Sequence, residues 1–164
     1  MARVNLIDRL DWSLIRDNVV QEMEAIDSVV KVHNRLRFDQ FSQEERFKKL
    51  FTPQGSSRIN AWTIQRLART TEFDTNREYE VTTTVGLDFW YQVDDRQDTQ
   101  AIFDQIIDDV FFQFQEPIRL DCTAELQGPM QLVEEDHRYF ATELVHHAEM
   151  QTLVKHRVFQ NSFR

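Results

Sequence analysis

The sequence of 164 residues predicts an α+β protein with a mainly antiparallel sheet. Strand-like segments follow one another directly in two places, first over 58–93 and again after 118, and strands that adjoin in sequence usually pair antiparallel. Amphipathic helical stripes lie before the first group of strands and between the two groups, so we expect an N-terminal and a central helix to pack on the sheet. Gly and Pro are rare, with three of each, which leaves little room for long loops.

The composition favours one domain, residues 1–164, built around a large core. Thirteen Phe and three Trp supply much of its bulk, and the net charge of −9 disfavours binding to nucleic acid or to anionic membranes. The single cysteine, Cys122, excludes an internal disulfide and a Cys-rich zinc site, and it suits a reducing compartment. No apolar run is long enough to span a membrane, and the charged N-terminal stretch is unlike a signal peptide.

Three helices follow from periodicity and capping signals. Apolar residues at steps of three and four predict a helix over 11–33. Ser42 followed by Glu45 forms a capping-box pattern and predicts a short helix over 42–51. A wide apolar stripe predicts the central helix over 99–115.

A long β-hairpin is predicted over 58–93, with the turn sequence DTNR between its strands. Its second half, YEVTTTVGLDFWYQV (79–93), alternates strictly between two faces. Fifteen residues at about 3.3 Å each would span roughly 50 Å. A compact chain of this length has a diameter of roughly 40 Å. The strand is therefore expected to reach beyond the core of its own chain, with a bulge at Gly86 where it bends.

The last third of the chain returns to strand patterns. Alternation predicts strands over 118–126 and 139–158, with a turn at the QGPM sequence that follows the first of them.

The five histidines do not form a metal-ligand pattern. His146 and His147 are neighbours in a predicted strand and point to opposite faces. His146 and His156 share a face but lie about 33 Å apart in a straight strand. We therefore expect no metal site and place the histidines at the surface or in interfaces.

Carboxylates leave open a second interpretation, a monomeric or dimeric domain that binds a small ligand or hydrolyses it in an acidic pocket. It would use groups such as Asp94, Asp95 and Asp104, and at least two of them must converge in one cavity. Cys122 lies on an apolar strand face, and the serines lack a glycine elbow. We expect no enzyme activity, no catalytic residue and no cofactor.

Several aromatic side chains depart from the apolar pattern of their own element. Trp62 and Trp90 lie among polar residues of their strand faces, and Phe112 lies off the stripe of the central helix. Such residues are either second-layer core or contacts to another chain, where aromatics are enriched. Arginines interleave with aromatics on the first hairpin strand, a weak pattern for nucleic-acid contact in an acidic chain. The candidate interface residues are Trp62, Trp90, Phe112, Arg58, Arg66 and Arg69.

The order of these elements resembles that of the tail terminator and neck terminator (tail completion) proteins of tailed bacteriophages. The likeness is carried by REYEVTTTVGLDFWYQV, TQAIFDQIIDDVFFQF and LQGPMQLVEEDHRYFATELVHHAEMQTLV, which together cover roughly the second half of the chain. The 34–57 segment departs from the family pattern because it inserts a helix before the first strand.

The resemblance implies a structural virion protein of the tail or neck, assembled in the host cytoplasm. Its partners would be itself, in a homo-oligomeric ring that is commonly a hexamer, the tail-tube protein and the head-neck connector. The ring would cap the tail tube, stop its polymerisation and let DNA pass without specific binding. The long hairpin strand would pack on the neighbouring subunit in this ring.

Overall fold

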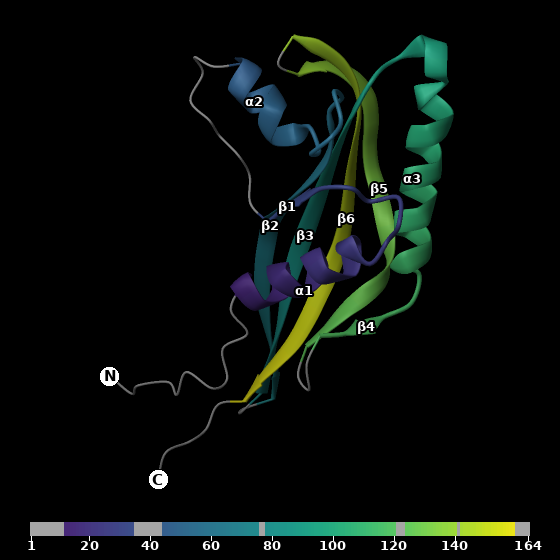
Figure 1. The fold of residues 1–164 in the computed structure, drawn as a ribbon. Coiled ribbons are helices and arrows are strands. Elements are labelled where there is room, and N and C mark those ends of the chain that lie inside the picture. The colour runs from purple at the N-terminus through teal and green to yellow at the C-terminus, as the bar shows by residue number, and fades with distance from the viewer. Residues whose placement is uncertain (1–11, 35–43, 76–77, 121–123, 141, 160–164) are drawn as a thin grey trace.

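The computed structural model describes residues 12–34, 44–75, 78–120, 124–140 and 142–159. These residues form a curled six-stranded sheet in the order β1-β2-β3-β6-β5-β4 with three α-helices packed on it (Figure 1). β1 runs parallel to β2 and the other pairs are antiparallel, which confirms the α+β class. The elements are α1 (Trp12–Glu24), β1 (Val32–His33), α2 (Glu44–Phe51), β2 (Asn60–Thr75), β3 (Glu78–Gln92), the 3-10 helix η2 (Asp95–Gln97), α3 (Thr99–Gln113), β4 (Ile118–Arg119), β5 (Ala124–Phe140) and β6 (Glu143–Phe159).

The hairpin over 58–93 is present as β2 and β3, which pair antiparallel along almost their whole length. α3 agrees with the predicted helix 99–115 to within two residues at its end. α2 agrees with the described part of the predicted helix 42–51.

The predicted helix 11–33 is wrong beyond Glu24, where α1 ends. A turn follows, and β1 then pairs with Trp62 and Thr63 of β2. Of the two residues that continue the apolar periodicity, Ile26 is buried in the core from this non-helical segment, whereas Val30 is 57% exposed and Val29 is buried instead. The apolar residues after Glu24 are therefore buried according to the path of the turn and not according to the helical period.

The predicted strands 118–126 and 139–158 are also wrong, because the turn that separates them lies at a different place in the sequence. β5 is one strand that runs through the QGPM sequence, and the chain reverses beside Thr142 instead. Thr142 has a left-handed backbone (φ 71°), although no Gly or Asn marks this turn. The ladder shifts register between Gln127 and Gln131, so the strand absorbs the Gly-Pro pair as an irregularity.

Gly128 allows β5 to pass close to the end of α3. A Cβ atom at this position would lie 2.8 Å from the carbonyl oxygens of both Phe114 and Gln115. These are backbone atoms that cannot turn away, so a glycine is required here for steric reasons.

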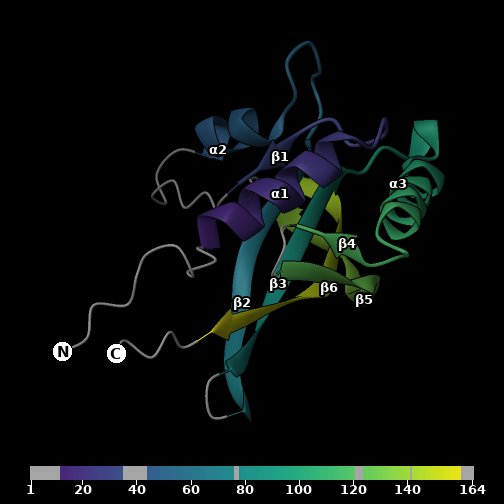
Figure 2. The same ribbon diagram turned by 90° about the horizontal axis from the view of Figure 1, so that it is seen from below.

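The two faces of the sheet are covered differently. α1 crosses one face and α3 lies beside β5 (Figures 1 and 2), and both contribute to the main core. α2 packs on the other face, where Phe51 joins a small cluster with Phe140 and Val145. We call the first the helix-covered face and the second the open face, because α2 covers only one end of it. In the described part of the chain, no helix is long and apolar enough to cross a membrane.

Candidate interaction site

Trp62 belongs to the core of its own chain. Its ring stacks on Phe89, with centroids 4.3 Å apart and planes 7° apart, and Phe89 stacks in turn on Phe103 of α3. Trp62 has no exposed surface. Of the two interpretations for this residue, the position in the fold supports core packing.

Trp90 lies on the open face and is half-buried. Its ring centroid is 4.6 Å from that of Phe140 and 4.3 Å from that of His147, and it packs against the small cluster beneath α2. The Arg138 guanidinium carbon lies 5.8 Å from the ring centroid. Trp90 is therefore also held within its own chain.

The remaining candidates are not gathered in one patch. Phe112 is 79% exposed on α3. Arg58 forms an ion pair with Asp94 and donates to the Gln97 side chain at the start of the hairpin. Arg66 and Arg69 lie exposed on the outer half of β2, and the Arg66 guanidinium carbon is 5.9 Å from the ring centroid of Trp12.

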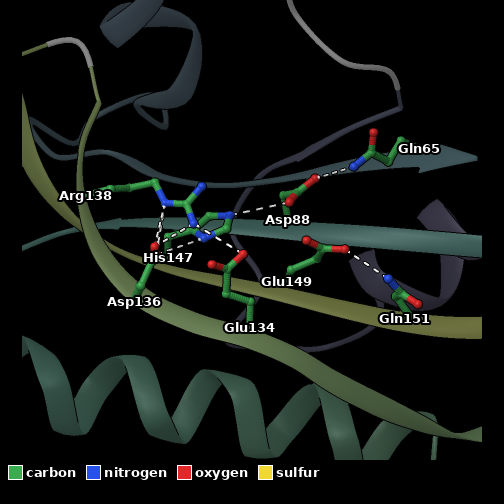
Figure 3. A network of polar contacts seen from close by, with 8 residues as sticks. All are labelled: Gln65, Asp88, Glu134, Asp136, Arg138, His147, Glu149 and Gln151. Atoms are coloured by element: carbon green, nitrogen blue, oxygen red, sulfur yellow. Dashed lines mark hydrogen bonds and ion pairs between the residues drawn. The ribbon is translucent and has the colours of Figure 1, made fainter. Parts of the chain in front are cut away.

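A polar network on the open face joins four strands (Figure 3). Its centre is His147 of β6, which is only 2% exposed and lies between two carboxylates. Nδ1 is 3.2 Å from an oxygen of Asp136 on β5, and Nε2 is 3.4 Å from an oxygen of Asp88 on β3. Gln65 of β2 donates to the other Asp88 oxygen at 2.9 Å. The network therefore ties β2, β3, β6 and β5 together side by side.

Arg138 completes the network at its β5 end. Its guanidinium donates to both oxygens of Asp136 and lies 3.4 Å from Glu134. The hydrogen bond from Arg138 lowers the pKa of Asp136 below the ordinary value of 3.8 more strongly than burial raises it. The charged form of Asp136 is thus stabilised where it faces His147.

This arrangement favours a structural role over acid–base chemistry. An Asp–His pair can move protons only if the imidazole reaches a reacting group, and His147 is enclosed by Trp90, Asp88 and Asp136. A neutral imidazole can donate to only one of the two carboxylates. The network fixes how the strands lie together in the part of the sheet that α1 and α3 do not cover.

The expectation of surface histidines is wrong for four of the five. His33, His146, His147 and His156 are each no more than 7% exposed. The sequence did indicate that His146 and His147 point to opposite faces, and they do. What it could not show is the register that places Asp88 and Asp136 beside His147, since the three residues come from three strands.

His146 packs on the helix-covered face beneath α3. Thr99 Oγ1 lies 3.0 Å from its Nε2 atom, and its ring contacts Phe103 and His137. Burial lowers the pKa of His146 below 6.5, the charge of His137 lowers it further, and Asp104 with Asp95 opposes the shift.

None of the three carboxylates proposed for an acidic pocket lines the described pocket. Asp94 caps η2 and pairs with Arg58, and Asp104 accepts a hydrogen bond from Gln100 on the exposed side of α3. A shallow pocket of about 470 Å³ does lie beside α3, but it has no carboxylate in its lining: Ser28, Asn60, Tyr91, Ala101, Ile102, Gln105 and Ile106. The described pocket does not meet the requirement of the acidic-site interpretation.

The sheet has two long edges that no described strand covers. β1 pairs with β2 only at Trp62 and Thr63, so the outer edge of β2 is open beyond them. Eight consecutive residues of β2, 66–73, are exposed. β4 pairs with β5 only at Leu126 and Glu125, so no described strand pairs with β5 over 131–139, although α3 runs beside this strand and its Gln100 donates to Glu135 at 3.4 Å. These two edges are the candidate interaction surfaces.

Exposed apolar side chains lie along both edges. On β2 they are Leu67, 38% exposed, and Phe73, 86% exposed. On β5 they are Leu132, Val133 and Tyr139, the last 79% exposed. An unpaired edge that carries large apolar residues is prone to pair with another chain.

Comparison with known proteins adds no relative to this picture. No protein-family model matches the chain, and no curated protein matches it.

Proposed function

We propose that this chain is a structural virion protein that forms the terminator ring of a bacteriophage tail or neck. The observation that carries the proposal is the outer half of the long hairpin, where β2 leaves its own core with residues 66–73 exposed. Natural proteins usually shorten, charge or cover such an edge. In a ring of copies the neighbouring subunit would cover this edge, which explains why β2 extends beyond the core of its own chain.

The ring, a hexamer in this proposal, would cap the last ring of tail-tube subunits and join it to the head-neck complex. The net charge of −9 suits a channel through which DNA passes without binding. The enclosed position of His147 favours an assembly role over turnover.

The test of self-association is solution mass, measured by light scattering after size exclusion over a range of concentrations. We expect a species near six times 19.7 kDa, seen as rings by electron microscopy. A monomer at every concentration would remove the self-association on which the proposal rests.

The test of the terminator role is tube length. The tail-tube protein encoded in the same genome is polymerised with and without this chain. We expect shorter tubes that carry one ring at an end. Rings that leave tube length unchanged would contradict the terminator role but not the ring itself.

A further inference from the structure

We infer that neighbouring subunits of the ring join through two different strands, the outer half of β2 in one subunit and residues 131–139 of β5 in the next. This inference deepens the proposed function and rests on it, because it supplies the contact from which the ring is built. The partner is a second copy of this chain.

The sheet topology allows this contact to continue the sheet. β2 and β5 lie toward opposite edges, with β3 and β6 between them. Each of these neighbouring pairs is antiparallel, so β5 runs opposite to β2. When the next subunit keeps the same orientation, its β2 meets β5 antiparallel, the pairing already used in most of the sheet.

Charge distinguishes the two edges. The exposed part of β2 carries Arg66 and Arg69 against Glu72, a net charge of +1. Residues 131–139 of β5 carry three carboxylates, Glu134 to Asp136, against one arginine, which leaves −2 with His137 neutral. Two copies of the β5 edge would bring together two segments of net negative charge, which destabilises a strand pair, whereas the β2 edge and the β5 edge carry net charges of opposite sign and attract.

The charged side chains also share one face of the sheet. Arg66 and Arg69 stand opposite Val85 and Thr83, on the helix-covered face. Glu135 pairs with Ala148, which belongs to the main core on that same face. In a continuous sheet the two arginines and the neighbour's Glu135 therefore lie on the same face, the helix-covered face.

Apolar residues follow the same division. Phe73 stands opposite Tyr79, and Leu132 stands opposite Met150, both on the helix-covered face. The contact would bury part of Phe73, which is 86% exposed in the single chain. A contact between two unlike surfaces is heterologous, and such contacts build rings when the rotation between subunits closes.

Charge reversal provides the experiment. We expect Arg69→Glu and Glu135→Lys each to raise the concentration at which the ring dissociates by about fivefold or more, because each opposes like charges across the contact. The double variant Arg69→Glu with Glu135→Lys restores opposite charges and should recover most of the association. Circular dichroism confirms that each variant folds.

Two matched control variants alter the net charge by the same amount, but at positions away from the two edges. Arg96→Glu on η2 and Asp108→Lys on α3 are exposed positions and should leave the ring mass unchanged. If the wild-type chain forms a ring but the single variants at 69 and 135 behave like these controls, the edge pairing is overturned and the proposed function remains. If the wild-type chain forms no oligomer, both fail together.

Discussion

His147 shows how one residue can hold a broad surface in place. It bridges the carboxylates of Asp88 and Asp136, and with Gln65 the network extends over four strands. Polar groups that are buried together in this way specify one arrangement, because each loses its partner if the strands shift. The open face therefore has a fixed register although α2 covers only one end of it.

Trp90 provides the first prediction at the scale of the residue. Trp90→Glu should lower the free energy of unfolding by about 2–4 kcal/mol, because it removes ring packing on Phe140 and places a charge against the small apolar cluster. Urea unfolding followed by circular dichroism measures the loss. Phe112→Glu is the control, at a position 79% exposed, and should change stability by less than about 0.5 kcal/mol. Equal losses in the two variants would contradict the position of Trp90.

His146 predicts a pH dependence. Its pKa is lowered by burial in the fold, so the unfolded chain binds a proton more readily just below pH 6.5. Stability from this residue is therefore complete above pH 6.5 and falls as the pH drops through the folded pKa. Asp136 affects the free energy of unfolding in a separate pH range. Because its pKa is lowered in the fold, the stability that it contributes is lost only as the pH falls below 3.8.

The measurement is the slope of the unfolding free energy between about pH 7.5 and 5.5, compared between wild type and His146→Phe. We expect the slope to be smaller in the variant. Loss of the contact to Thr99 adds a cost that does not vary with pH. Identical slopes would show that His146 does not carry the effect.

At the scale of the element, the predicted bulge at Gly86 is wrong in its place, because the extra residue of the hairpin is Leu67. The ladder shifts register between Arg66 and Ala68, so the bulge is on β2 and not on β3. A Cβ atom added to Gly86 would lie 2.8 Å from the Leu67 side chain. Gly86 therefore accommodates the bulged residue of the opposite strand.

This contact predicts a coupled pair of substitutions. Gly86→Val should destabilise the chain by about 1–3 kcal/mol, because Leu67 must move aside. The double variant with Leu67→Ala should cost less than the sum of the two single variants. Thermal unfolding of all four proteins measures the coupling, and additive losses would exclude a steric origin.

The elements also show how much the sequence could predict. The hairpin and α3 follow from local periodicity, and the structure confirms both. The continuity of β5 through Gly128 could not be recognised, because this glycine is required by the carbonyl oxygens of Phe114 and Gln115, just after α3, in a contact between distant segments. The network around His147 could not be predicted from the sequence for the same reason, since it depends on the pairing of β6 with both β3 and β5.

At the scale of the whole molecule, the open edges lie at different heights. Across the ladders, Arg69 is level with Leu126, whereas Glu135 is level with Trp62. A neighbour that sets its Arg69 beside Glu135 is therefore displaced along the strands by six residues, counted on β3 from Thr83 to Phe89, or roughly 20 Å.

This displacement would give the ring wall a slant. In this contact the repeating unit is the four strands β2, β3, β6 and β5, which at about 4.8 Å each make one repeat roughly 19 Å wide. A rise of roughly 20 Å over that width closes on itself only if the strands incline by roughly 45° to the ring axis, at the upper end of the inclinations typical of closed β-barrels. The joined ends of β2 and β3, at Thr75 and Glu78, would then gather at one rim, and those of β5 and β6, at Phe140 and Glu143, at the other (Figure 1). Such a ring has two unlike ends, and each could bind a different neighbour along the axis.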